Sequence, residues 1–180
     1  NLLNIDKIKF SDIKNIIIAT VVPDALRNLK IFCENYISKN IYIIGENIND
    51  LGININIDNP REAGADRLLN AVAVKYLYST PSIIVDFGTA TTFDIILKNG
   101  QYEGGIITPG VNLSLKMLYN SASQLPKISL KYEDKIPLIG KNTIHSMKSG
   151  VYWGYFSLID GLLRKIKDQY KFEFKVIATG

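Results

Sequence analysis

The stretch Ser82–Leu97, SIIVDFGTATTFDIIL, places a short polar segment between two apolar runs. The runs are rich in β-branched residues, which predicts two buried strands joined by a tight turn. The polar segment holds one acid, one glycine and three threonines: Asp86, Gly88, Thr89, Thr91 and Thr92. Glycine allows close backbone approach, threonine hydroxyls can contact phosphate oxygens, and a carboxylate can hold a cation. The pattern therefore indicates a phosphate-binding turn, although a hairpin with a hydrogen-bonded aspartate would share it.

The composition is that of an ordinary globular protein. Of the 180 residues, 47% are hydrophobic and 21% are charged, and the net charge is +4. The basic residues are scattered, which gives little support to nucleic-acid binding. The longest aliphatic run, Ile16–Val22, is far too short to span a bilayer, and the single cysteine, Cys33, allows no disulfide framework. We therefore expect a cytoplasmic protein without nucleic-acid or membrane partners.

The order of the predicted elements indicates an α/β fold. From Ser82 onward the chain reads as three strands, two helices and a strand, at residues 82–88, 91–97, 101–110, 111–123, 142–170 and 174–180. The earlier part reads as strand, helix, strand and helix, at residues 15–23, 23–37, 41–45 and from about 61 or 65 to 79. This order is similar to the duplicated ribonuclease-H-like domains, with mixed sheets, of the actin and sugar-kinase superfamily. We expect an incomplete first domain at residues 1–80 and a second domain, lacking its C-terminal end, at residues 81–180.

A second motif, NPREAGADRLLNAVA, places charged side chains at the start of a predicted helix. Asp66 and Arg67 lie in its first turn, ahead of an apolar face. An exposed carboxylate beside an arginine suits a base that takes a hydroxyl proton while the arginine holds an anionic group. The alternative is structural, because an acid near a helix N-terminus also complements the helix dipole.

Two later segments could bring the backbone or a side chain to a ligand. EGGIITPG contains Gly104, Gly105 and Gly110, which predict close backbone approach or, alternatively, a β-bulge and a helix cap. In GKNTIHSMKSG, Thr143 is expected to cap a helix and His145 to lie on the surface. Each segment alone is weak evidence for a site.

Taken together, in this order and at these spacings, the motifs closely resemble type III pantothenate kinases. The resemblance extends from Ile16 to Gly180 and rests on IIIATVVP, NPREAGADRLLNAVA, IIVDFGTATTFD, GGIITPG, LPKI, IGKNTIHSMKSG and VIATG. It implies that pantothenate is phosphorylated with ATP, in the first step of coenzyme A synthesis. It also implies a homodimer that needs magnesium and a monovalent cation, either potassium or ammonium.

The resemblance implies roles for individual residues as well. Five of them would contact pantothenate: Gly64, Ala65, Asp66, Arg67 and Thr143. Asp66 would be the catalytic proton acceptor, and Thr143 would reach the substrate near the dimer interface. Asp86 would bind the monovalent cation, and Thr89 would contact the ATP phosphates. Arg67 could hold either the pantothenate carboxylate or the phosphoryl group in transfer.

The sequence departs from the family pattern in two places. Many members have a tyrosine where this chain has Ile57, so the substrate pocket could be shaped differently. The family also opens with a strand that ends in a first phosphate loop, which this sequence lacks. The chain is therefore either a fragment of a longer protein, which the non-Met start favours, or a degenerate copy. Two alternatives stay open: a non-catalytic transcription accessory factor of the same family, and an actin-like kinase for another small hydroxylated substrate.

Overall fold

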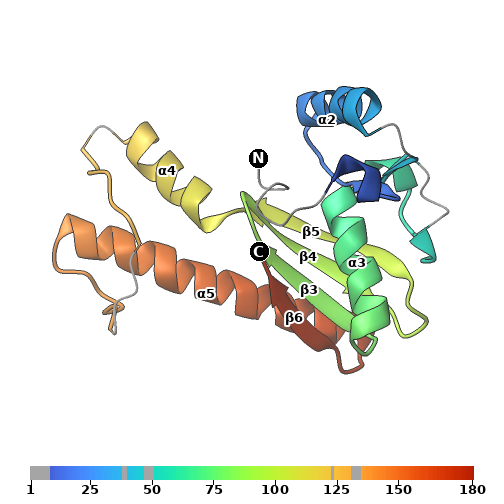
Figure 1. The fold of residues 1–180 in the computed structure, drawn as a ribbon. Coiled ribbons are helices and arrows are strands. Elements are labelled where there is room, and N and C mark those ends of the chain that lie inside the picture. The colour runs from blue at the N-terminus through green and yellow to red at the C-terminus, as the bar shows by residue number, and fades with distance from the viewer. Residues whose placement is uncertain (1–8, 38–39, 47–50, 123, 131–134) are drawn as a thin grey trace. The chain divides into compact units, whose positions relative to one another are not determined.

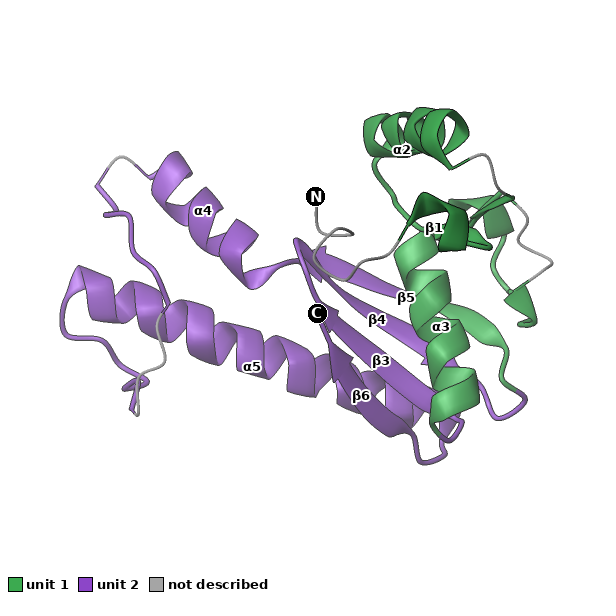
Figure 2. Ribbon diagram, in the orientation of Figure 1, with its two compact units in different colours: residues 1–78, 100–104 green, residues 79–99, 105–180 purple. Residues whose placement is uncertain are grey.

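The chain forms two compact units. The computed structural model describes residues 9–37, 40–46, 51–122, 124–130 and 135–180. Unit 1 comprises residues 1–78 and 100–104, and unit 2 comprises residues 79–99 and 105–180 (Figure 2). Each unit contains both helices and strands.

Unit 1 contains a small parallel sheet and two α-helices. Its elements are the 3₁₀ helix η1 (Phe10–Asp12), β1 (Ile16–Ile18), α2 (Pro23–Tyr36), β2 (Ile41–Ile43), the 3₁₀ helix η3 (Pro60–Glu62) and α3 (Ala65–Leu77). Pro23 lies in the first turn of α2, as predicted, because its fixed φ suits a helix start and its missing N–H would have no helical partner there. The first strand ends at Ile18, earlier than the apolar run predicted.

One face of the β1–β2 pair is exposed. Ile17 and Tyr42 lie opposite each other in the parallel register, and they are 70% and 54% exposed. Ile18 is buried, because successive strand residues point to opposite faces. Cys33 on α2 is also buried, as predicted.

Unit 2 is built on a four-stranded mixed sheet with two helices (Figure 1). Its elements are β3 (Ser82–Phe87), β4 (Ala90–Ile96), β5 (Tyr102–Pro109, of which the first three residues belong to unit 1), α4 (Val111–Ser121), α5 (Thr143–Tyr170) and β6 (Lys175–Thr179). The strand order is β5-β4-β3-β6, with β3 antiparallel to β4 and parallel to β6. The order of elements predicted from Ser82 onward is therefore confirmed, and so is an α/β fold with a mixed sheet.

The main core of unit 2 lies between the sheet and α5. Alternate residues of β3 and β4 pack with α5 and with the segment before β6; the buried members are Ile83, Val85, Phe93, Ile95, Ile166 and Phe174. The residues between them, including Ile84, Asp94 and Ile96, are buried on the opposite face. Both faces of β3 and β4 are therefore covered, which explains why these strands read as continuous apolar runs.

A second cluster joins α4 to the N-terminal half of α5. Leu115, Met147 and Val151 are its buried members, and Leu125 and Ile128 of the following linker pack against them. This half of α5 extends away from the sheet (Figure 1). Within the described residues, none of the helices has the length and apolar character needed to cross a membrane.

Candidate functional site

The turn between β3 and β4 is the first candidate site. The Gly88 N–H donates a hydrogen bond to the Ala90 carbonyl, with an N–O distance of 3.0 Å. Asp86 is half-buried near the end of β3, whereas Phe87 and Thr89 are exposed. The predicted tight turn is confirmed, and Thr89 is accessible to a ligand.

Gly110 packs directly against this turn. It is the N-cap residue of α4, and its N–H donates to the Thr89 carbonyl at 3.0 Å. A Cβ atom at Gly110 would lie 2.4 Å from the Thr89 oxygen and 2.5 Å from the Gly88 oxygen, both of them backbone atoms. Gly180 approaches the same turn, since a Cβ atom there would lie 2.6 Å from the Phe87 oxygen. The turn is thus held from the ends of β5 and β6 by contacts that need glycine.

A line of polar side chains crosses one face of the sheet beside the turn. Asp86 on β3 is the register partner of Thr92 on β4, so the two side chains lie on the same face. The Thr92 hydroxyl donates to Asp94 Oδ2 at 3.1 Å, and Asp94 is fully buried. Oxygen atoms of this kind are the ligands that hard cations prefer. The described part of the chain has no group of three or more His, Cys, Asp and Glu side chains that could hold a metal ion. A cation at Asp86 would therefore also need hydroxyl, carbonyl or phosphate oxygens.

In unit 1, the Gly-Ala-Asp-Arg motif forms the start of α3. Gly64 is the N-cap residue, Ala65 is buried, and Asp66 is exposed in the first turn. Asp66 Oδ1 accepts a hydrogen bond from the Arg67 N–H at 2.8 Å. A Cβ atom at Gly64 would lie 2.6 Å from Asp66 Oδ1, so this glycine leaves room for the carboxylate. The motif therefore presents an exposed carboxylate in a fixed orientation.

Arg67 is half-buried, and its guanidinium lies over an aromatic ring. Its Cζ atom is 5.9 Å from the centroid of the Tyr102 ring, and Tyr102 is only 1% exposed. This cation–π contact favours that position of the planar head group. Nearby, the Asn56 N–H donates to the Tyr102 carbonyl at 2.8 Å, and a Cβ atom at Gly104 would lie 3.2 Å from Ile57 Cγ2. The close backbone approach predicted at Gly104 is confirmed, and Ile57 is the side chain that it meets.

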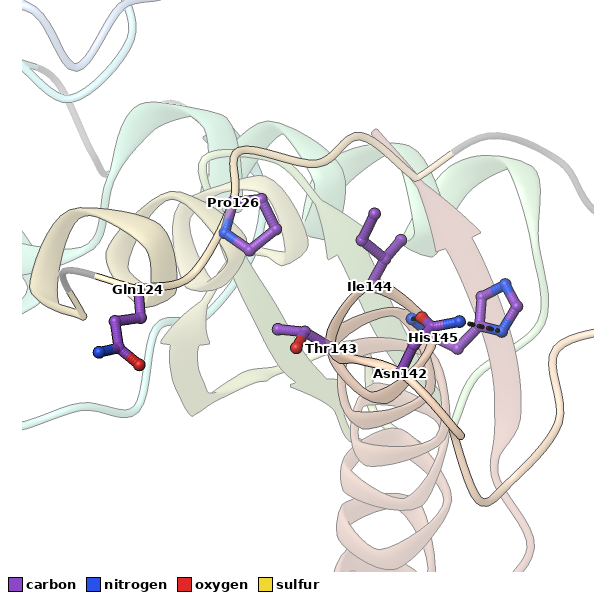
Figure 3. A pocket seen from close by; sticks show the side chains of 6 residues that line it. All are labelled: Gln124, Pro126, Asn142, Thr143, Ile144 and His145. Atoms are coloured by element: carbon purple, nitrogen blue, oxygen red, sulfur yellow. Dashed lines mark hydrogen bonds between the residues drawn. The ribbon is translucent and has the colours of Figure 1, made fainter.

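Thr143 is the first residue of α5 and lines an open pocket. The pocket has a volume of about 500 Å³, and its lining residues are Gln124, Pro126, Asn142, Thr143, Ile144 and His145 (Figure 3). The cap of α5 is Asn142, whose side chain accepts a hydrogen bond from the His145 N–H at 2.8 Å. The expectation that Thr143 caps the helix was therefore wrong, and its hydroxyl is not needed for that purpose. His145 is exposed, as predicted.

The length of α5 separates Thr143 from the β3–β4 turn. The Tyr155 hydroxyl oxygen on α5 lies 2.9 Å from Thr91 Oγ1 on β4. Tyr155 follows Thr143 on α5 by more than three helical turns, which corresponds to about 18 Å along the axis of α5. Unit 2 thus brings Asp86 and Thr89 together at the turn but places Thr143 at the far end of α5, and the residues Gly64 to Arg67 form a separate group in unit 1.

Two polar residues beside the turn were not predicted. Asp94 could have been found from the strand period of two, which puts it on the same face as Thr92. Nothing in the sequence indicated Tyr155. This residue lies on α5, more than sixty residues further along the chain, and only the fold brings its hydroxyl group to Thr91.

Comparison with known proteins identifies the family. Residues 1–165 match a family model described as type III pantothenate kinase. The chain is 44% identical over 179 residues to the type III pantothenate kinase of Paramagnetospirillum magneticum, covering 99% of this chain and 68% of that protein. It is 46% identical over 173 residues to the type III pantothenate kinase of Halalkalibacterium halodurans, covering 96% of this chain and 67% of that protein. The chain therefore spans about two thirds of the length of these curated relatives.

A solved structure supports the fold. A crystal structure of a conserved protein assigned to the Baf family of transcriptional activators, from Campylobacter jejuni, matches with a TM-score of 0.55 at 23% identity. The match covers 89% of this chain and 68% of that one, and at this identity it bears on the fold alone. The family model covers most of the chain and the curated relatives are 44–46% identical to it, so the chain belongs to the type III pantothenate kinase family.

Proposed function

We propose that this protein transfers the γ-phosphoryl group of ATP to the hydroxyl group of pantothenate, giving 4′-phosphopantothenate for coenzyme A synthesis. The observation that carries the proposal is the 44–46% identity to relatives named type III pantothenate kinase. Phosphoryl transfer has a loose transition state, so it depends mainly on alignment and charge neutralisation. Such a reaction needs a proton acceptor for the attacking hydroxyl group, which Asp66 would provide, and a site that aligns the phosphates, which the turn at Thr89 would provide.

Asp66 is the proposed general base. Its Oδ1 atom is held by the Arg67 N–H, which orients the carboxylate so that Oδ2 can accept the hydroxyl proton of pantothenate. Gly64 and Ala65 would bring the backbone close to the same substrate. The Arg67 head group, which lies over the Tyr102 ring, would offer N–H donors to an anionic group, either the pantothenate carboxylate or the phosphoryl group in transfer.

The β3–β4 turn is the proposed ATP and cation site. Thr89 is exposed at its tip and would contact the phosphates, while Asp86, with Thr92 opposite it, would hold a potassium or ammonium ion. These oxygen donors suit such a cation, which would supply positive charge beside the triphosphate. Magnesium would be bound chiefly by the phosphate oxygens of ATP, in keeping with its preference for phosphates over all-protein sites.

We further propose a homodimer in which Thr143 serves the pantothenate site of the other copy. Apolar side chains are exposed along the N-terminal half of α5 and the loop before it: Leu138, Ile139, Ile144, Tyr152 and Phe156. A group of exposed apolar residues is typical of an interaction surface. Thr143 lies among these residues, about 18 Å along α5 from the contact of Tyr155 with the sheet. We therefore expect Thr143 to reach the substrate of a second copy and not a substrate bound at the β3–β4 turn of its own chain.

The proposed architecture is a pair of actin-like domains at residues 1–80 and 81–180. The sheet of unit 2, with β3 antiparallel to β4 and parallel to β6, supports this for the second domain. We propose a cytoplasmic location, because the reaction consumes ATP.

The test is an assay of the purified full-length protein with ATP, Mg²⁺, K⁺ and pantothenate, in which mass spectrometry detects the phosphorylated product. Asp66→Asn keeps the shape of the side chain and removes its charge. We expect turnover to fall at least about a hundredfold while ATP binding is nearly unchanged. Asp168→Asn, at an exposed acid on α5, is the matched control and should keep full activity.

Two outcomes would overturn the proposal. A protein that transfers no phosphoryl group to pantothenate would favour a non-catalytic factor, and one that phosphorylates only another hydroxylated compound would correct the substrate. Near-normal turnover in Asp66→Asn would instead remove Asp66 from its role as base.

A further inference from the structure

The hydroxyl group of Tyr155 lies at a junction between α5 and two strands of the sheet. It donates a hydrogen bond to the Pro109 carbonyl at the end of β5, and its oxygen lies 2.9 Å from Thr91 Oγ1 on β4. A phenol has one proton. Because the phenol O–H is donated to the Pro109 carbonyl, the Thr91 hydroxyl is the donor in the second bond. A single side-chain oxygen of α5 therefore joins β4 to the residue that precedes Gly110.

This link continues from Pro109 to the β3–β4 turn. Gly110 follows Pro109 directly, donates to the Thr89 carbonyl, and lies against the Gly88 and Thr89 oxygens at a distance that excludes a Cβ atom. The Pro109 carbonyl and the Gly110 N–H belong to one planar peptide group, so the two cannot move independently. A shift of the Pro109 carbonyl would therefore be passed to Gly110 and on to Thr89.

We propose that Tyr155 is a positioning residue for the ATP-binding turn, acting through Pro109 and Gly110. The inference rests on the proposed function, in which Thr89 contacts the ATP phosphates. Tyr155 contributes in two separable ways. Its side chain is half-buried, so the ring contributes apolar burial, whereas its hydroxyl group makes the two hydrogen bonds that tie the end of β5 to β4.

The test replaces Tyr155 by phenylalanine in the full-length protein, which removes the hydroxyl group and keeps the ring. Since the net effect of a hydrogen bond is modest, we expect the KM for ATP to rise about three- to tenfold while the KM for pantothenate stays within about twofold. Tyr170→Phe is the matched control, because it removes the hydroxyl group of another half-buried tyrosine on α5, whose ring packs with Phe172 and Phe174. The control should leave the KM for ATP unchanged even if it lowers the melting temperature.

A second measurement is independent of activity. Exchange of the Gly110 amide hydrogen, followed by NMR, should be about three- to tenfold faster in Tyr155→Phe, because the bond to the Thr89 carbonyl opens more often. Faster exchange with an unchanged KM for ATP would overturn the proposed role of the turn in ATP binding. Unchanged exchange and an unchanged KM would overturn the role of Tyr155 and leave the kinase activity standing. Equal changes in Tyr170→Phe would show general destabilisation and would also refute the inference.

Discussion

Replacing Gly110 with alanine tests whether the candidate ATP site depends on close backbone packing. The new Cβ atom would lie 2.4 Å from the Thr89 oxygen and 2.5 Å from the Gly88 oxygen, whereas ordinary contacts of a Cβ atom begin at 3.4 Å. One side must therefore move by about 1 Å, and a misplacement of that size can cost about a hundredfold in rate. Both oxygens belong to the backbone, so the turn cannot avoid the clash by a side-chain rotation.

We expect kcat/KM for ATP to fall about a hundredfold in Gly110→Ala. The free energy of unfolding should fall by about 1–3 kcal/mol, the usual cost of an added group in a packed region. Steady-state kinetics with ATP as the varied substrate measure the first effect, and urea unfolding measures the second.

Gly161→Ala on α5 is the matched control for this substitution. Apart from the chain neighbours and the backbone of its own helix, no atom lies within 4 Å of the position of its Cβ atom, so the change adds the same methyl group without a clash. Helix propensity alone should then stabilise the protein by about 0.5–1 kcal/mol, with the kinetics for ATP unchanged. Wild-type kcat/KM for ATP in Gly110→Ala would refute the reasoning, and an equal loss in both variants would show that the contact with the turn is not the cause.

Two further substitutions probe the remaining parts of the site. Asp86→Ala should abolish most activity and any increase that potassium or ammonium produces over sodium, measured as kcat in each salt; an unaltered enzyme that is equally active in all three salts would contradict the cation site. Gly64→Ala should change the free energy of unfolding by less than about 1 kcal/mol, because the clashing atom is the movable end of Asp66, yet it should lower kcat about tenfold by reorienting the carboxylate. Wild-type kcat in that variant would show that the orientation of Asp66 is not important.

The hairpin of β3 and β4 could be predicted from the sequence because its signals are local. Apolar runs, a glycine turn and β-branched residues all lie within Ser82–Leu97. The end of β1 could not be predicted in this way. Its apolar run continues to Val22, but pairing stops at Ile18 because the partner strand, β2, ends at Ile43 in the register. An apolar run indicates burial, whereas the length of a strand depends on its partner.

The same distinction between local signals and features set by the fold applies to the candidate site. Asp66, Asp86 and Thr89 belong to short motifs, so their place at a helix start or a turn followed from neighbouring residues. The helix cap of α5 could not be predicted from neighbouring residues, because Asn142 and Thr143 are adjacent and both residue types can cap a helix. Only the extended backbone at Asn142, with φ −150° and ψ 166°, decides between them.

The three threonines of the turn segment have different surroundings, which indicates three different roles. Thr89 is exposed at the tip of the turn, and Thr91 is 1% exposed, with its hydroxyl bonded to Tyr155. Thr92 lies opposite Asp86 and donates to Asp94. Because side chains alternate along a strand, the adjacent Thr91 and Thr92 must point to opposite faces of the sheet. Thr91 therefore anchors β4 to α5, whereas Thr92 lies beside the candidate cation ligand Asp86, and Thr89 is left exposed at the proposed phosphate site.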